Sequence, residues 1–408
     1  MSSPSRIVRV GMIGCGEISQ VAHIPALGFM SDFYRITYLC DVSADALTHC
    51  SSKISGTPPK TTFDPEELCS SPDVDVVFIA NSTEYHAAHA ILGLKHDKFV
   101  FIEKPMCYSL QDADAIIAAE KESKGTVMVG YMRRYALAFL DAIEEVGGMD
   151  KILYARVRGK SEKSPSSTLA DSLDIIGPNA GFVSQSGTFA RKFDDFKKAD
   201  IDDKNAQSDA QMNQGLTVEC GVPVDGNTRL MWMLLGGLGS HDLSVMREAL
   251  GMPTAVRGAS LGFPFWNALL QYPGFCVSYE SGIDGIPRFD AHIEIYSQRK
   301  SVRVQYDSPY VKGLPTTMTV CEDVNGVYKE TMVRKTYEDA YTLEFRELHA
   351  LVTQGTPVKT TAADARADLE IFGMIMKAGY DGSFMTGGLP AKAMNGKHST
   401  NGVNGAKA

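Results

Sequence analysis

The sequence predicts an α/β protein in which a doubly wound parallel sheet is followed by an α+β domain with a mostly antiparallel open sheet. Three observations predict this. Strand-like and helix-like segments alternate over residues 1–130, strand-like runs succeed one another over residues 255–333, and the chain is long. With 408 residues, 44% of them hydrophobic, it can form more than one buried core.

Short apolar runs rich in Val, Ile and Phe predict the strands of the first domain, residues 1–130. These runs are Ile7 to Ile13, Ile36 to Cys40, Val74 to Ala80, Phe99 to Ile102 and Val127 to Val129. Apolar residues at helical spacing lie between them, over Glu17 to Met30, Ala44 to Ser51, Tyr85 to Leu94 and Leu110 to Glu122. Such alternation is typical of a parallel sheet with helices on both faces.

The second predicted domain spans residues 131–386. It opens with a polar insertion at about 160–227, interpreted as a long excursion and a candidate lid. A helix is predicted within Met231 to Gly251, and helices at Tyr341 to Gln354 and Ala362 to Tyr380 follow the sheet. The predicted strands are Ala255 to Leu261, Phe275 to Tyr279, Ala291 to Tyr296, Ser301 to Tyr306, Met318 to Cys321 and Tyr328 to Val333. Residues 387–408 have too little apolar content to fold and are predicted to be disordered.

Composition excludes several classes of partner. A formal net charge of -9, from 40 Lys+Arg against 49 Asp+Glu, provides no basic field for nucleic acid or an anionic membrane. The eight cysteines form no C-x-x-C pair, which favours reduced thiols and gives no zinc or other metal site. No apolar stretch is long enough for a membrane span, and no signal peptide is evident. We therefore expect a cytoplasmic protein.

A glycine turn follows the first predicted strand and opens the first helix, the context that dinucleotide-binding turns require. Gly14 permits a tight turn, Gly16 lets the backbone approach a pyrophosphate, and the small Ser19 allows close packing of helix on strand. The helix N-terminus offers free N–H groups to phosphates. A turn of this kind also arises for packing reasons alone.

Asp41 ends the second predicted strand, 25 residues after Gly16. This is close to the spacing of the acidic residue that binds the adenosine ribose in dinucleotide sites. A carboxylate there repels a 2′-phosphate and no arginine follows at once, so NAD is favoured over NADP. The alternative role of Asp41 is an N-cap of the next helix.

Lys104, between Glu103 and Pro105, emerges at the carboxyl end of the strand that begins near Phe99. Open α/β sheets bind ligands at this edge, and a following proline restricts the backbone of the lysine. A solvated turn lysine is the alternative. Asn81, Ser82 and His86 follow the third predicted strand, where they either position the cofactor or cap a helix.

These positions, taken in order, resemble the glucose-fructose oxidoreductase / inositol dehydrogenase / rhizopine catabolism (Gfo/Idh/MocA) family over roughly residues 6–380. The matching segments are Gly14 to Ser19, Ala22 to Ala26, Asp41, Asn81 to Thr83 with His86, Glu103 to Pro105, Gly130 to Tyr135 and Gly239 to Asp242. The resemblance implies a Rossmann domain and an α+β domain whose open sheet backs the active site and often forms an oligomer interface. It also implies a homodimer or homotetramer.

The resemblance further implies that Lys104 and His241 are catalytic. Histidine exchanges a proton near neutral pH and suits the base, while Lys104 suits stabilisation of the alkoxide oxygen; the two assignments are interchangeable. The family usually has an aspartate four residues before the histidine, where this chain has Gly237. Asp242 either replaces that aspartate or is an acidic residue favoured at a helix start.

The predicted function is hydride transfer between NAD and a hydroxyl or carbonyl of a sugar, polyol or cyclitol-like substrate, the work of an NAD(P)-dependent dehydrogenase acting on CH–OH groups. The alternatives are a redox-neutral NAD-dependent epimerase, lyase or glycosidase, and a cofactor-sensing regulator without activity. The predicted cofactor-binding residues are Gly14, Gly16, Glu17, Ile18, Asp41, Asn81, Ser82, His86, Glu103, Lys104 and Pro105.

Overall fold

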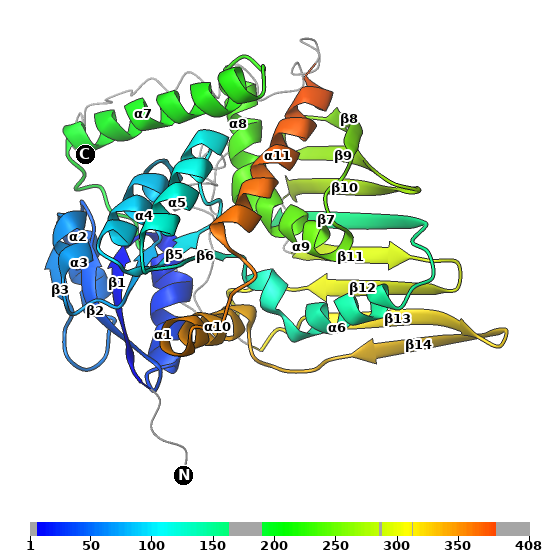
Figure 1. Cartoon of the computed structure of the whole chain (residues 1–408), viewed down its shortest axis with the longest axis horizontal. Coiled ribbons are helices and arrows are strands. Elements are labelled where there is room, and N and C mark those ends of the chain that lie inside the picture. The colour runs from blue at the N-terminus through cyan, green and yellow to red at the C-terminus, as the bar shows by residue number, and fades with distance from the viewer. Residues whose placement is uncertain (1–5, 163–189, 285–287, 312, 381–408) are drawn as a thin grey trace, which may run out of the picture.

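The chain folds as two sheets with helices between them (Figure 1). The computed structural model describes residues 6–162, 190–284, 288–311 and 313–380. Most of the predicted insertion before residue 190 and the predicted disordered tail at 387–408 lie outside these residues. The predicted fold class, a parallel sheet followed by a mostly antiparallel one, is confirmed.

The first sheet has six parallel strands in the order β3-β2-β1-β4-β5-β6. They are β1 Val8–Ile13, β2 Tyr34–Cys40, β3 Lys60–Thr62, β4 Val76–Ile79, β5 Phe99–Glu103 and β6 Val127–Gly130. The strand order changes direction between β1 and β4. Such a switch point opens a crevice at the carboxyl ends of the strands, where α/β proteins bind ligands.

Alternate residues of these strands face two different hydrophobic clusters, one on each face of the sheet. On β4, Val76 and Phe78 pack with α1, α2 and α10, whereas Val77 and Ile79 pack with α3, α4 and α5. The bounds are η1 Ser19–His23, α1 Ile24–Phe29, α2 Ala44–Ser51, α3 Pro65–Ser70, η2 Thr83–Tyr85, α4 His86–Lys95, α5 Leu110–Glu122 and α10 Ala340–Gln354. Burial on both faces explains why the strands read as continuous apolar runs.

Some predictions for this domain need correction. The single helix expected over Glu17 to Met30 is a π-helical turn, η1, followed by the short α1. Strand β3 and helix α3 were not predicted, because β3 has two exposed residues out of three and α3 spans only six residues.

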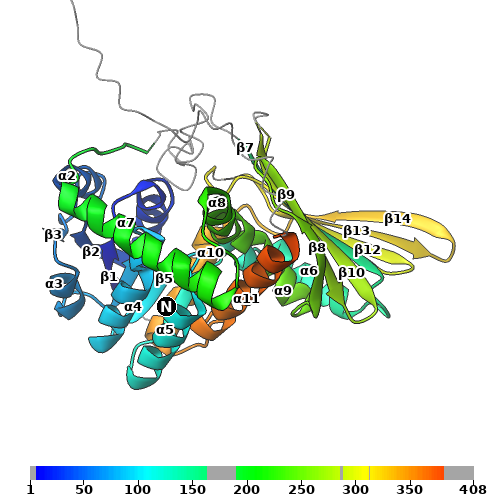
Figure 2. The same cartoon turned by 90° about the horizontal axis from the view of Figure 1, so that it is seen from above.

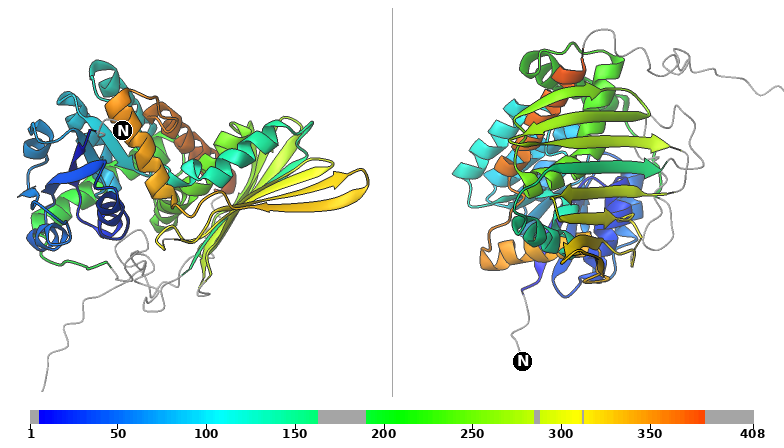
Figure 3. Two further views of the ribbon diagram at one scale, coloured as in Figure 1. Left: turned by 90° about the horizontal axis from the view of Figure 1, so that it is seen from below. Right: turned by 90° about the vertical axis from the view of Figure 1, so that its right-hand side faces the viewer.

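The second sheet has eight strands in the order β14-β13-β12-β11-β7-β10-β9-β8, and only the β7–β10 pair is parallel. The bounds are β7 Tyr154–Glu162, β8 Ala255–Ser260, β9 Phe265–Tyr272, β10 Phe275–Asp284, β11 Asp290–Tyr296, β12 Lys300–Tyr306, β13 Thr317–Val324 and β14 Val327–Val333. Strands β7 and β9 were not among those predicted. In Figures 2 and 3 the helices lie against one face of this sheet and leave its other face open.

The remaining helices lie between the two sheets or beside the first one. They are η3 Met132–Tyr135, α6 Leu137–Gly147, α7 Lys198–Met212, η5 Asn213–Glu219, α8 Gly226–Leu234, η6 Leu235–Gly239, α9 Ser240–Leu250 and α11 Ala362–Gly379. The segment predicted as a polar excursion thus contains α7 and η5. Its helices were not predicted because α7 is polar nearly all round, with only Ser208 and Met212 buried.

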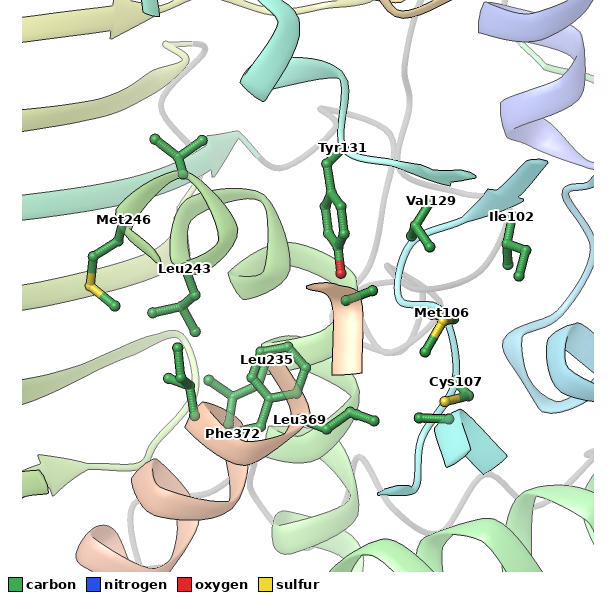
Figure 4. Packing of buried hydrophobic residues seen from close by; sticks show 14 of the residues in the cluster. Ile102, Met106, Cys107, Val129, Tyr131, Leu235, Leu243, Met246, Leu369 and Phe372 are labelled. Carbon is green, nitrogen blue, oxygen red and sulfur yellow. The ribbon is translucent and has the colours of Figure 1, made fainter. Parts of the chain in front are cut away.

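The two domains share one hydrophobic core. Figure 4 shows Val129 and Tyr131, at the end of the first sheet, facing Leu235, Leu243 and Phe372 from the helices of the second domain. These side chains belong to a single buried cluster that continues into the second sheet. The two domains are therefore joined by continuous hydrophobic packing.

A buried ionic network lies close to this core. Asp364 on α11 accepts hydrogen bonds from Arg134 on η3 and from Arg247 on α9, with 2.5 Å between Arg247 Nη1 and Asp364 Oδ1. Arg247 also reaches Asp368 Oδ1 at 2.9 Å, and Arg134 reaches Glu248 Oε2 at 2.5 Å. The two arginine side chains are less than a tenth exposed. The network fixes α9, α11 and η3 relative to one another.

Candidate active site at the junction of the two domains

The glycine turn lies at the switch point of the first sheet. Gly14 has φ +102°, and a Cβ there would lie 2.5 Å from the Asn81 backbone nitrogen, so the position requires glycine. The Gly14 N–H donates to the Cys40 carbonyl at 2.8 Å, which ties the turn to the end of β2. The turns after β1, β2 and β4 therefore meet at one place.

Gly16 is exposed, and a Cβ built on it would meet nothing within 4 Å. Glu17 and Ile18, which follow it, are partly exposed. Ser19 is fully buried and its hydroxyl donates to the Gly14 carbonyl at 2.7 Å, which fixes the turn on the helix below it. The turn thus has open space at Gly16 and is held in place by the hydrogen bond from Ser19.

The Asp41 carboxylate bridges the turns after β1 and β2. Its Oδ2 accepts from the Cys15 N–H at 2.7 Å and its Oδ1 from the Ser43 N–H at 2.9 Å. Burial raises the pKa of Asp41, and the two backbone hydrogen bonds oppose this. Ser43 caps α2, because its hydroxyl accepts from the Ala46 N–H at 2.9 Å. The alternative interpretation of Asp41 as that N-cap is wrong.

His86 connects the turns after β4 and β5. Its Nε2 lies 3.1 Å from the Asn81 carbonyl and its Nδ1 2.9 Å from the Pro105 carbonyl, and the side chain is buried. The Asn81 side chain lies 3.1 Å from the ring of His89. Ser82 makes no side-chain cap with the short helix that follows. His86 therefore positions the neighbouring turns.

Lys104 reaches from the end of β5 across to the second domain. Its Nζ donates to the Gly237 carbonyl at 2.8 Å. Burial lowers the pKa of Lys104, with Arg133 adding to the effect and Glu103 opposing it. Glu103 lies on the other side, its Oε1 2.9 Å from Nε2 of His23. Burial raises the pKa of Glu103, but the His23 contact together with the charges of Lys104 and His86 outweighs this and leaves it lowered.

His241 lies at the start of α9 and faces Lys104 and Arg133. It is 8% exposed, and its Nδ1 has no hydrogen-bond partner among the described residues. Burial, followed by the charges of Lys104 and Arg133, holds the pKa of His241 well below 6.5. The imidazole is therefore neutral near pH 7 and has a free nitrogen.

Asp242 forms an ion pair with Arg133. The Arg133 guanidinium donates to Asp242 Oδ1, and a Cβ on Gly159 would overlap the Asp242 carboxylate. Burial raises the pKa of Asp242, with Arg133 opposing this. At the position where the family pattern has an aspartate, this chain has Gly237, and the Lys104 amine donates to its backbone carbonyl.

Arg133 is a site residue that the sequence interpretation left aside. Its guanidinium lies over the rings of Phe289, at 5.5 Å, and Tyr306, at 5.3 Å. Its position directly after β6, at the edge where Lys104 emerges, was the available signal. Among the described residues, no group of three or more His, Cys, Asp or Glu is placed to hold a metal ion, and no helix is long and apolar enough to cross a membrane.

Residues 8–131 match the model of an oxidoreductase family with an NAD-binding Rossmann fold, GFO_IDH_MocA. This match covers the first domain of the chain. Inositol 2-dehydrogenase 3 of Saccharopolyspora erythraea is 33% identical over 151 residues, which are 36% of this chain and 44% of that protein. Myo-inositol 2-dehydrogenase of Thermotoga maritima is 32% identical over 39% of this chain and 47% of its own length. The matches to these curated relatives span less than half of their length.

Solved structures share the fold of the whole chain. A levoglucosan dehydrogenase in complex with NADH and levoglucosan has a TM-score of 0.67 at 17% identity, covering 91% of this chain and 97% of its own. The 3-ketoreductase KijD10 from Actinomadura kijaniata, in complex with NADP and TDP-benzene, has a TM-score of 0.65 at 14% identity, covering 92% and 98%. The fold of this chain thus resembles that of these structures over both domains.

Proposed function

We propose that this protein is an NAD-dependent oxidoreductase that transfers a hydride between the cofactor and a CH–OH or carbonyl carbon of a sugar, polyol or cyclitol. One observation carries the proposal. The amine of Lys104, from the first domain, donates to the Gly237 carbonyl of the second at 2.8 Å, and its charge acts on the buried imidazole of His241. The relatives named above, which include inositol dehydrogenases, support the class of substrate.

The residues at the glycine turn fit a dinucleotide. Gly16 leaves the open space that a pyrophosphate needs, and the Asp41 carboxylate lies at the end of β2, where the ribose of such cofactors is bound. Bound NAD supplies the hydride acceptor. The same carboxylate repels a 2′-phosphate, so we propose NAD over NADP as the cofactor.

Lys104 and His241 have different roles in the proposed reaction. We assign Lys104 as the base, because burial lowers its pKa and so favours the neutral amine that accepts the hydroxyl proton at Nζ as the hydride leaves the carbon. We assign the neutral imidazole of His241 to hydrogen-bond the reacting oxygen. Arg133, neutralised by Asp242, contacts neighbouring hydroxyls. In the reverse direction Lys104 returns the proton to the alkoxide.

The test of this function is NADH formation by the purified chain with a panel of sugars, polyols and cyclitols. Turnover with NAD that falls at least about 100-fold in His241→Ala would support the proposal. His96→Ala is the matched control, because His96 pairs with Glu66 at 2.6 Å and contacts none of the predicted site residues. Binding of NAD without net reduction on any substrate would instead favour the redox-neutral epimerase, lyase or glycosidase.

The pH dependence of oxidation tests which group is the base. Because Lys104 must be neutral, kcat/KM is expected to rise with pH through a value below the ordinary 10.5 of lysine. Gly237→Asp places a carboxylate beside the protonated amine and raises the pKa of Lys104, which moves the rise about one pH unit upward. In His241→Asn the rise is expected to stay in place with a lower plateau. Loss of the rise in His241→Asn would assign it to His241.

The open face of the eight-stranded sheet is the surface that we propose for assembly into a homodimer or homotetramer. Figure 3 shows this face without covering helices.

A further inference from the structure

A short segment of the second domain lies across the dinucleotide turns of the first. Residues 190–197, here called the strap, run directly into α7, and α7 packs against η2 at the start of α4. Phe193 of the strap packs against the hydrophobic cluster beneath α2, and its ring is 5.8 Å from that of His49. The strap is thus seated on the first domain at the side where β2 ends.

Gln20 fixes the start of the strap beside the glycine turn. Its side-chain amide accepts from the Arg191 N–H at 2.8 Å and donates to the Arg191 carbonyl at 3.1 Å. The same amide nitrogen donates to the Cys15 carbonyl at 3.0 Å. A two-point bond between one side chain and one backbone residue sets both the position and the direction of the strap.

Helix α7 fixes the other end. Tyr85 donates to Asp203 Oδ2 at 2.6 Å, and Gln211 donates to the Glu84 carbonyl at 2.6 Å. The strap therefore spans from the turn after β1, past the turn after β2, toward the turn after β4. These are the three turns that line the proposed cofactor crevice.

Asp195 brings a second carboxylate to the turn after β2. Its Oδ1 accepts from the Ser43 hydroxyl at 2.5 Å and its Oδ2 from the Asp45 N–H at 3.1 Å. Ser43 also donates its own N–H to Asp41, so one residue holds both carboxylates. The hydrogen-bond donors at the N-terminal end of α2 that are closest to Asp41 are thereby taken by the chain itself.

We propose that Asp195 is a specificity-determining residue that excludes the 2′-phosphate of NADP. This inference rests on the proposed function, in which Asp41 binds the adenosine ribose. A phosphate on the 2′-oxygen of that ribose would lie next to Asp41 and need the donors at Ser43 and Asp45. Asp195 already accepts from both, and its charge repels the phosphate dianion.

The arginine of the strap is otherwise engaged. The Arg191 guanidinium lies 5.7 Å from the Phe193 ring, beside His49 in the last turn of α2. Ser43 and Asp45 are in the first turn of that helix. Arg191 is therefore directed to the end of α2 opposite Asp195.

The experiment compares the dissociation constants of NADH and NADPH, measured by cofactor fluorescence at low ionic strength without substrate. Asp195→Asn is expected to tighten NADPH about three- to tenfold and to change NADH less than about twofold, because an exposed charge acts through screened repulsion. Asp194→Asn, the neighbouring strap carboxylate, removes the same charge and is expected to leave both constants unchanged.

In the double variant Asp41→Asn with Asp195→Asn, the gains for NADPH are expected to be non-additive, because Ser43 donates to both carboxylates and both face the same phosphate. An NADPH-to-NADH ratio that is the same in wild type and Asp195→Asn would overturn the inference. A wild-type preference for NADPH would also overturn it and assign Arg191 to the phosphate. The ratio of dissociation constants is measured by binding alone. A protein that binds cofactor but shows no turnover would therefore contradict the proposed function without testing the role of Asp195.

Discussion

Replacing Lys104 with methionine is expected to lower kcat for alcohol oxidation about 10³-fold while the affinity for NAD changes less than about threefold. Methionine keeps the length of the side chain but has no group that accepts the hydroxyl proton. The variant also loses the hydrogen bond from Lys104 to the Gly237 carbonyl. Because this contact between the domains does not involve the glycine turn, NAD affinity is expected to change little. Steady-state turnover and calorimetric NAD binding on the same preparation measure the two effects.

Lys95→Met provides the control for this variant, since Lys95 is exposed in the last turn of α4. Its turnover and cofactor affinity are expected to match those of wild type. A parallel loss of NAD binding in Lys104→Met would show that Lys104 holds the cofactor, and that the proton moves through another group such as His241.

Replacing Asp364 with alanine is expected to destabilise the chain by about 3 to 5 kcal/mol, because it leaves Arg134 and Arg247 buried without their shared partner. Burial raises the pKa of Asp364, but its hydrogen bonds from the two arginines outweigh this and leave the pKa lowered. This stabilising contribution is therefore present above the unfolded-state pKa and is lost as the pH falls through the lower folded-state value. Urea unfolding followed by circular dichroism measures the change.

Asp114→Ala tests whether burial causes that cost. Asp114 also pairs with an arginine of α11, Arg366, at 2.6 Å, but the Asp114 side chain is 59% exposed. The expected loss is below about 1 kcal/mol. Equal losses in the two variants would contradict the assignment of the Asp364 effect to buried arginines that have lost one of their two carboxylate partners.

Local signals were sufficient for much of the first domain. Helices α2 and α5 have the predicted bounds because Ser43 and Ser109 cap them and their apolar spacing is regular. Strand β9 was missed although it alternates exposed and buried residues, because it starts within an aromatic run whose outward members, such as Phe265, are as apolar as the inward ones. Alternation of apolar and polar residues cannot reveal a strand where both of its faces carry apolar side chains.

The candidate site shows a similar division. Gly14 and Gly16 were identified from spacing, since the strand–turn–helix geometry is local. The ion pair of Arg133 with Asp242, and the reach of Lys104 to Gly237, join residues more than 100 positions apart. Asp195 lies 152 positions from Ser43, and no local pattern marks such a contact.

Helix α10 is made late in chain synthesis, although it packs on the first sheet. The face of the first sheet that carries Phe78 and Phe101 is closed by Phe345, whose ring lies 5.5 Å from each. Phe345 leaves the ribosome about 215 residues after the last strand of that sheet. At a synthesis rate of about 5 to 20 residues per second, the part of that face under α10 stays uncovered for roughly 10 to 40 s, while α1 and α2 cover the rest. The N-terminal domain of the growing chain therefore exposes aromatic surface until the second domain has been made.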